Sequence, residues 1–358
     1  RSHAACGNRS AALSTSPRLT SMAATLKDIA KKVGLHPATV SRALNPKTSH
    51  LVNPATVAKV RKAASALDYV PNPMASGLRT SRSHTIGVVI PDLTNPLFPG
   101  MVRGIQDTLS HAGYTPLLVN TDNDPGSEES VVSSLSARRV DGFIMATARR
   151  DHPLLADLAD KFPVVLINRV TDSAQVSSVT ADEQHGIRLA VEHLCGLGHT
   201  QIAHLAGPVW SSTGHERQQA FARAMRDNGL TAARKPPAVD AWNVEAATKT
   251  ATALLEGNPD TTAVVCANDQ LALGAILAAK KLRRKCPKDL SVVGYNDMPF
   301  MDLVDPPLTT VRVPQHDIGA EAARLLLSLL VEDGAMPTKH VRLTPELMVR
   351  GSTAPPRR

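Results

Sequence analysis

The chain of 358 residues is poor in aromatic side chains and in cysteine. Phe, Trp and Tyr make up 3% of it, so an aromatic residue in a predicted cleft stands out. Four scattered cysteines, with no CxxC pair, argue against a metal site and favour reduced thiols in a cytosol. No apolar run reaches the roughly 18–20 residues that a membrane-spanning helix needs, so no membrane partner is expected.

The sequence patterns of common enzymes are missing as well. The first strand–helix turn of the α/β region reads PDLTNP, with neither GxGxxG nor a P-loop. His215 and Glu216 start like HExxH, but the fifth residue is Gln219, so no zinc motif forms. No GxSxG elbow occurs. We therefore expect no enzymatic activity, no metal and no cofactor.

Residues 26–45, LKDIAKKVGLHPATVSRALN, predict two short helices joined by a tight turn. Thr25 caps the first helix together with Asp28, and Gly34 supplies the backbone freedom of the turn. Pro37 suits the first position of the second helix, where a missing N–H costs nothing. The pattern is a helix-turn-helix.

Each of the two helices has an apolar face and a polar one. The predicted inward residues are Ile29, Ala30, Val33, Val40 and Leu44. The outward face of the second helix consists of Pro37, Ala38, Ser41 and Arg42. Helix-turn-helix units read the DNA major groove with that outward face.

A plain helical hairpin is the alternative to a DNA-binding unit, and charge distinguishes them. Residues 24–80 hold nine Lys and Arg against two acidic residues, a net charge of +7. Residues 81–358 carry −2, and residues 1–23 carry +3. Positive charge gathered at the helix-turn-helix favours a polyanionic partner.

From Thr85 onward, short apolar strands alternate with amphipathic helices. This alternation predicts parallel α/β sheets with helices on both faces, arranged as two similar lobes. The expected strands are 85–90, 115–120, 142–146, 164–168, 177–181, 201–207, 263–268 and 290–296. The expected helices include 54–68 of the head and 99–112, 183–197, 214–228, 244–256 and 269–283. Ligands in such folds bind at the carboxyl ends of the strands.

The motifs LKDIAKKVG, ATVSRALN, VPNPMASGLR, IGVVIPDLTNPLF, RRVDGFI, LGHTQIAHLAGP, ANDQLALGA, LSVVGYND and PPLTTVR follow one another along the chain. In this order they resemble the lactose-repressor/galactose-repressor (LacI/GalR) family of bacterial transcription regulators. The resemblance implies an all-α helix-turn-helix head and an α/β two-lobed core like that of periplasmic binding proteins. The expected domains are 1–22, a disordered or artefactual extension; 23–70, the DNA-binding domain; 71–83, the hinge; 84–182 plus 313–343, the N-terminal lobe; and 183–312 plus 344–358, the C-terminal lobe.

The resemblance also assigns DNA contacts. Pro37, Ala38 and Arg42 fall where family members touch base edges, and Thr39 and Ser41 where they touch phosphate. Arg42 can grip guanine O6 and N7 in a fork. In the hinge, Leu78 matches the leucine that wedges into the minor groove, with Arg79 beside it on the DNA. His36 departs from the serine common before the second helix, which leaves its role open.

The effector cleft implied by the resemblance contains Leu97, Phe98, Asn168, Thr213, Arg217, Trp242, Asn268 and Asn296. Amides and an arginine fork suit hydroxyl groups, and Phe98 and Trp242 can cover a flat ligand face. A core position is the alternative for Trp242. The family often carries Asp where Asn168 and Asn296 stand, which hints at a ligand other than a typical sugar.

The predicted protein is a cytoplasmic, nucleoid-associated transcriptional regulator, most simply a repressor. It binds a pseudo-palindromic double-stranded DNA operator as a homodimer, with a tetramer as the alternative assembly. A small-molecule effector, a sugar or related metabolite, binds between the lobes and controls operator affinity. The competing function is a periplasmic-type sugar-binding receptor without enzymatic activity, which would require a secretion signal and no helix-turn-helix.

Overall fold

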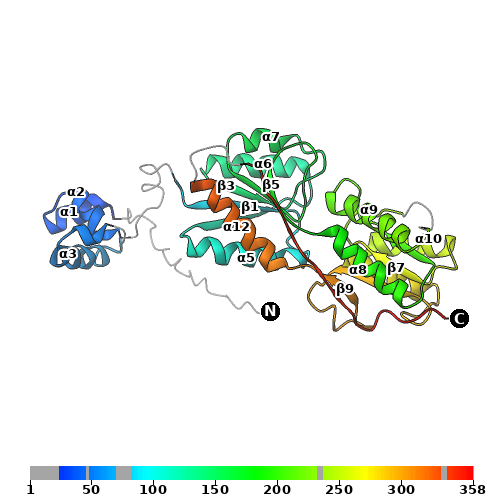
Figure 1. Ribbon diagram of the computed structural model, residues 1–358. Helices are drawn as coiled ribbons and strands as arrows, with labels where there is room; N and C mark the ends of the chain where they lie inside the picture. The colour runs from blue at the N-terminus through cyan, green and yellow to red at the C-terminus, as the bar shows by residue number, and fades with distance from the viewer. Residues whose placement is uncertain (1–23, 46–47, 70–81, 232–236, 332–336, 358) are drawn as a thin grey trace, which may run out of the picture. The chain divides into compact units, whose positions relative to one another are not determined.

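The computed structural model describes residues 24–45, 48–69, 82–231, 237–331 and 337–357. The chain forms two compact units that divide between Ser76 and Gly77 (Figure 1). We call the described part of the first unit the head and that of the second unit the core. Among the described residues, every helix is too short or too polar to traverse a lipid bilayer.

The head is a small helical unit. Its elements are α1 (Leu26–Val33), α2 (Pro37–Leu44), η1 (Ser49–Leu51) and α3 (Pro54–Ser65). Its buried side chains are Ile29, Ala30, Val33, Val40, Ala43, Val60, Ala63 and Ala64. Leu44 packs against this cluster as predicted but is only partly buried, and Ala43 beside it is fully buried. Helix α3 ends at Ser65 rather than near Asp68, which has a φ of 47° that a helix cannot continue through.

The first lobe of the core is a parallel sheet with helices on both faces. Its strands are β1 (Thr85–Ile90), β2 (Thr115–Asn120), β3 (Gly142–Met145), β4 (Val164–Ile167), β5 (Ser177–Ala181) and β10 (His340–Leu343). Its helices are α5 (Leu97–His111), α6 (Pro125–Ala137), α7 (Leu154–Ala159) and α12 (Gln315–Val331). The strand order is β10-β5-β4-β3-β1-β2, so the end of the chain supplies an edge strand.

The second lobe repeats this architecture. Its strands are β6 (Ile202–Leu205), β7 (Ala263–Cys266), β8 (Ser291–Asn296), β9 (Thr309–Arg312) and β11 (Glu346–Met348). Its helices are α8 (Glu183–Gly196), α9 (Ser212–Asp227), α10 (Val244–Gly257) and α11 (Asp269–Lys281). The order is β11-β9-β8-β7-β6, and the edge strand β11 runs antiparallel to β9.

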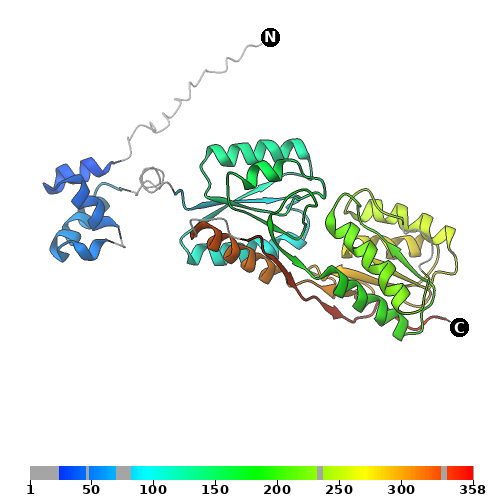
Figure 2. The same cartoon turned by 45° about the horizontal axis from the view of Figure 1, so that its top comes forward.

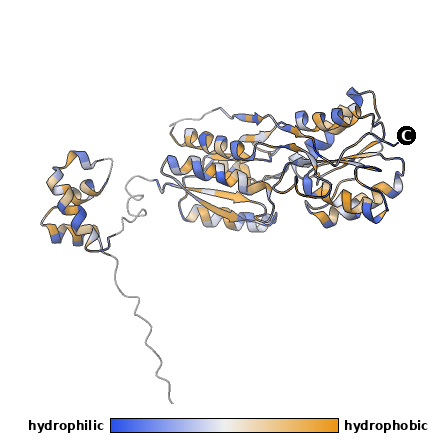
Figure 3. Cartoon of the chain, turned by 90° about the horizontal axis from the view of Figure 1, so that it is seen from below, coloured by the Kyte–Doolittle hydropathy of each residue, from blue (hydrophilic) through white to orange (hydrophobic). Residues whose placement is uncertain are grey.

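Alternating side chains of each strand explain why helices cover both faces. In β1, Ile86, Val88 and Ile90 pack in the apolar cluster shared with α5 and α12. The intervening Val89 packs in the cluster of α6 and α7. Figures 1 and 2 show these two helical layers on opposite sides of the first sheet, and Figure 3 shows the apolar strands between them. Strands buried on both faces are typical of parallel sheets.

Several predicted strands extend too far at their carboxyl ends. The sheet ladder stops at Ile167 and at Cys266, one and two residues before the expected ends. At the first of these places Asn168 adopts a left-handed φ of 62° and turns the chain away from the sheet. The residues left over form loops at the carboxyl edge, where ligands bind in such folds.

Candidate functional site

Hydrogen bonds fix both ends of α1, the first helix of the helix-turn-helix. Thr25 and Asp28 form a reciprocal capping box at the start of α1, with Thr25 N donating to Asp28 Oδ2 at 2.8 Å. Gly34 follows the helix with a φ of 70°, a conformation that glycine adopts without steric cost. Lys59 Nζ of α3 donates to the Val33 carbonyl at 3.0 Å and so satisfies the end of α1.

Helix α2 begins with a histidine cap. The Nδ1 atom of His36 accepts a hydrogen bond from the Ala38 N–H at 3.2 Å, and Pro37 occupies the first helical turn. The imidazole therefore replaces the hydroxyl or carboxylate that usually fills this position. This observation gives His36 a structural role that its sequence position left open.

The outward face of α2 holds the predicted DNA contacts. Ala38 and Arg42 are exposed, whereas Pro37, Thr39 and Ser41 are half-buried. The side chain of Arg42 is thus accessible to a base edge, and its contact with DNA stays a prediction. Leu78 and Arg79 lie outside the described residues, so the predicted wedge also stays a prediction.

All eight predicted effector residues line one cavity of the core, together with Asn95 and Arg169. We call it the effector cavity. Its residues come from strand ends and helix starts, as Asn168 follows β4, Asn268 precedes α11 and Asn296 ends β8. Its free volume is only about 20 Å³, about the room for one water. A ligand can enter only when the lining moves apart.

Two hydrogen bonds join the lobes that supply the residues of this cavity. The N–H of Arg150 in the first lobe donates to the Trp210 carbonyl of the second at 3.0 Å. The N–H of Val170 donates to Ser212 Oγ, at the start of α9, at 2.9 Å. Lobe separation must break both bonds, so the cavity is mechanically linked to the spacing of the lobes.

Arg217 of α9 is a buried cation with a complete set of partners. Its Nε and Nη2 atoms bind Glu183 of α8 at 2.5 and 3.0 Å, and Nη1 donates to the Ala267 carbonyl at 2.5 Å. The guanidinium also stacks on the Tyr295 ring, 3.8 Å from its centroid. Burial alone would lower the pKa of Arg217, but the Glu183 carboxylate more than offsets this and raises it. Arg217 therefore stays charged, and Glu183 balances its charge inside the protein.

Three asparagines of the cavity lining also have a role in the backbone conformation around it. Asn168 and Asn296 have left-handed φ angles of 62° and 107°, which asparagine tolerates better than most residues. Asn268 caps α11, because its Oδ1 accepts the Leu271 N–H at 2.8 Å. Its amide nitrogen is the part that remains for a ligand. Backbone conformation is thus one physical reason for asparagine at these positions.

Trp242 lines the cavity and is only partly enclosed by the apolar interior of the second lobe. It is half-buried, packs against the apolar cluster of the second lobe, and has a buried Nε1 without a hydrogen-bond partner. A Cβ atom on Gly207 would collide with its ring, so glycine leaves the space that the indole needs. The structure therefore places Trp242 in the lining of this cavity, and its contact with an effector stays a prediction.

Asn95 and Arg169 are the lining residues that sequence reasoning missed, and Arg169 is the charged one. It follows Asn168 directly, and its side chain is buried at 4% exposure. Its guanidinium carbon lies 5.0 Å from the ring centroid of Trp210, and that of Arg149 lies 4.5 Å from the same ring. An arginine directly after an expected strand end was the available signal, because side chains there reach the ligand edge of the sheet.

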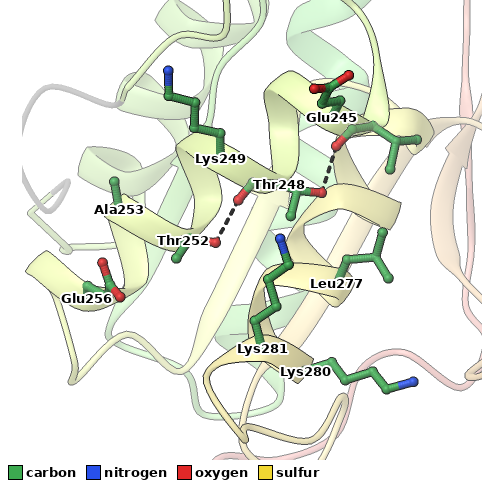
Figure 4. A pocket seen from close by; sticks show the side chains of 10 residues that line it. Glu245, Thr248, Lys249, Thr252, Ala253, Glu256, Leu277, Lys280 and Lys281 are labelled. Atoms are coloured by element: carbon green, nitrogen blue, oxygen red, sulfur yellow. Dashed lines mark hydrogen bonds between the residues drawn. The ribbon is translucent and has the colours of Figure 1, made fainter.

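A larger groove of about 960 Å³ lies between α10 and α11 (Figure 4). Its threonines are already used, since Thr248 Oγ1 and Thr252 Oγ1 each donate to a carbonyl of their own helix at 2.7 Å. Lys249, Lys280 and Glu256 stand at its margin as exposed surface charges. Without a buried polar group directed into it, this groove is a weaker ligand site than the effector cavity.

Comparisons with known proteins agree on both units. The family model of bacterial regulatory proteins, lacI family, matches residues 25–72, and that of the periplasmic binding protein-like domain matches residues 191–353. The HTH-type transcriptional regulator MalR of Streptomyces coelicolor is 36% identical over 347 residues, 93% of this chain and 97% of the relative. The HTH-type transcriptional repressor CytR of Escherichia coli is 34% identical, covering 92% and 96%. The chain belongs to the LacI family of bacterial regulatory proteins.

Solved structures of LacI-family regulators have the same fold. The lac repressor dimer bound to operator and the anti-inducer ONPF superposes with a TM-score of 0.83 at 29% identity, over 92% of this chain and 99% of that one. The complex of the regulator CelR with cellobiose gives 0.70 at 31% identity, over 92% and 99%. The predicted family, fold class and role as a DNA-binding transcriptional regulator rather than an enzyme are confirmed.

Proposed function

We propose that this LacI-family member is a repressor that binds its operator as a homodimer and is controlled by an effector in the effector cavity. The observation that carries the proposal is the exposed Arg42 on α2 in the same chain as a closed, polar cavity. Arg42 is the one side chain on that face able to fork onto guanine, while Pro37 and Ala38 offer only apolar contact. Such a regulator works at the nucleoid, in the cytoplasm.

The effector acts through the lobe spacing. Entry into a cavity of about 20 Å³ requires its lining to move, and a change in lobe spacing would break the bonds from Arg150 to Trp210 and from Val170 to Ser212. A ligand that favours one spacing changes the population of lobe arrangements, and through the hinge it changes how the two heads fit the operator.

An exposed apolar loop in the second lobe supports assembly. Phe300 and Leu303 are 71% and 75% exposed, which is unusual for large apolar side chains so close together. A second copy of the chain is the partner we propose for this surface. A two-fold dimer carries its heads to two half-sites, which makes the operator pseudo-palindromic. Sedimentation analysis of the full chain distinguishes the dimer from a tetramer.

The test is selection of operator sequences from random duplex DNA by the full chain. We expect an inverted repeat that binds at least about a thousandfold more tightly than random DNA at one fixed salt concentration. Arg42→Ala should relax the preference at one base pair per half-site by about 1–3 kcal/mol. An equal loss on every sequence would make Arg42 a phosphate contact.

Leu78→Ala tests the hinge separately. Loss of an apolar wedge should weaken selected operators strongly while ligand binding stays unchanged. Equal operator affinity in this variant and the parent protein would remove the wedge from the mechanism. Selection of no sequence at all would contradict the proposed function itself.

A further inference from the structure

The effector cavity carries an excess of positive charge. Its ten described lining residues include two arginines, Arg169 and Arg217, and no acidic residue. The carboxylate of Glu183 lies behind Arg217 and binds it through both oxygens. Glu183 therefore balances the charge of Arg217, and Arg169 is left without a bound counterion.

Arg169 is the cation without a counterion. Its Nη1 donates to Asn123 Oδ1 at 3.0 Å, and its buried Nε has no hydrogen-bond partner. Burial lowers the pKa of Arg169 to about 10, opposed by Glu128, while Arg149 and Arg217 lower it further. A charged group buried without a paired ion is costly, so an anion that reached Arg169 would offset that cost.

Glu128 is the acidic residue that raises the pKa of Arg169, but its carboxylate contacts other groups. It accepts a hydrogen bond from the Thr147 hydroxyl, and its Oε2 lies 3.3 Å from His152 Nε2. Glu128 therefore partly offsets the positive charge of Arg169 without forming an ion pair with it. The stacking of Arg169 and Arg149 on Trp210 holds two guanidinium groups near one ring.

The other polar groups of the cavity offer donors more than acceptors. The indole Nε1 of Trp242 is buried without a partner. The Oδ1 of Asn268 is used by the α11 cap, and that of Asn296 faces Arg217 Nη2 at 3.5 Å. A neutral polyol needs acceptors for its hydroxyl hydrogens, and the carboxylate that could supply them is held by Arg217.

We propose that the effector carries an anionic group, a phosphate ester or a carboxylate, whose oxygens bind Arg169 Nε in the effector cavity. The inference rests on the proposed function, because it names the chemical class of ligand that the same cavity takes. The anion supplies the counterion that Arg169 lacks, and its remaining oxygens accept from the donors around it. A charge-assisted hydrogen bond of this kind adds about tenfold or more to affinity.

The fluorescence of the two tryptophans tests the inference at the site. Trp210 stacks on Arg169 and Trp242 lines the cavity, and the chain has no third tryptophan. The full chain is titrated with inorganic phosphate and with matched probes: glucose, glucose 6-phosphate and glucuronate; ribose and ribose 5-phosphate. We expect a saturable signal at a concentration at least about tenfold lower for an anionic probe than for its neutral parent. Comparison of the phosphorylated probes with glucuronate shows whether the cavity binds a phosphate or a carboxylate more tightly.

Charge-matched variants assign the response. Arg169→Gln should abolish the preference for anions, and Arg169→Lys should retain part of it. Arg188→Gln removes the same charge from an exposed ion pair of α8 and should leave the preference intact. Circular dichroism shows whether Arg169→Gln is folded, which we expect because the change removes a buried cation. Neutral probes that bind as tightly as anions, no saturable response to any anion, or equal effects of Arg169→Gln and Arg188→Gln would each overturn the inference.

Operator binding separates this inference from the proposed function. A neutral ligand that changes operator affinity, with no anion preference, removes the anionic assignment and leaves the regulator intact. An anion that needs Arg169 but has no effect on operator affinity keeps the anion site and contradicts effector control.

Discussion

The head and the core place their polar chemistry in opposite ways. Among the described residues, every buried polar or charged side chain belongs to the core, including Glu183, Arg217 and Asp269. The head buries only apolar side chains, and the predicted DNA-contacting residues lie at least partly at its surface. The head can therefore meet DNA without rearrangement, whereas a ligand of the core competes with bonds that already exist.

Because of this difference, we expect DNA binding and folding stability to be independent in the head. In the core, we expect ligand binding and folding stability to be coupled. We expect replacement of Arg42 to alter the proposed contact with DNA and to leave the packing of the head unchanged, because the side chain is exposed. We expect replacement of Arg217 in the effector cavity to change both ligand affinity and folding, since Arg217 holds Glu183 and Ala267 together. Variants of each region test this separation.

The largest expected effect is on the buried ion pair. Glu183→Gln leaves the Arg217 guanidinium buried without a counterion and should lower the free energy of unfolding by about 3 kcal/mol, the low end of the range for such breaks. The amide oxygen still accepts one hydrogen bond, which limits the loss. Urea unfolding followed by tryptophan fluorescence measures it, since both tryptophans belong to the core.

Glu192→Gln is the matched control for this change. Glu192 is also on α8 and also binds an arginine, Arg188, at 2.7 Å, but that pair is exposed. Its loss should cost at most about 0.5 kcal/mol. Similar costs for the two variants would show that burial does not distinguish these ion pairs.

A second effect should appear on acidification and involves a buried histidine of the core. His204 is buried, bonds the Val265 carbonyl through Nδ1 at 2.8 Å and stacks on Phe221. Burial lowers the pKa of His204 from 6.5 to about 4. As pH falls from 6.5 to 4, the unfolded chain binds a proton and the folded chain does not, so stability falls over that window.

Asp269 has the opposite effect on the free energy of unfolding as pH falls. The pH dependence of the parent protein alone therefore does not report on His204. Burial raises the pKa of Asp269 to about 7, opposed by its hydrogen bonds, so its contribution is full below pH 4 and is lost as pH rises to 7. The difference in unfolding free energy between the parent and His204→Phe isolates the histidine. That difference should grow from pH 4 to 6.5, and a constant difference would contradict the buried neutral imidazole.

Periodicity and turn chemistry were enough to predict most elements of both units. Apolar strands such as TIGVVI and the capped helix from Leu26 carry their own local signals, so β1 and α1 match their expected ranges. Element ends were less predictable, because Asp68 and Asn168 stop their elements through positive φ angles that nothing nearby in the sequence demands. The antiparallel edge strand β11 depends on pairing with distant β9 and has only three residues to signal it.

The effector cavity shows the same limit at the level of side chains. The eight lining residues implied by the resemblance do meet, but the partners of Arg217 and Arg169 could not be predicted. Glu183 is 34 positions from Arg217 and Asn123 is 46 from Arg169, so only the folded chain brings them together. Their role in ligand binding stays a prediction.

The smallest expected effect concerns the histidine cap of α2. His36→Ala removes the acceptor for the Ala38 N–H and should destabilise the start of α2 by about 1 kcal/mol, while His36→Ser should restore the cap. Hydrogen exchange of the α2 amides in the full chain measures this as a several-fold loss of protection. Because the cap orients the outward face of α2, operator affinity should follow the same order, parent and serine above alanine. Unchanged protection in His36→Ala would mean that packing of Val40 and Ala43 alone sets the start of the helix, and that the head needs no polar bond to position its DNA-binding face.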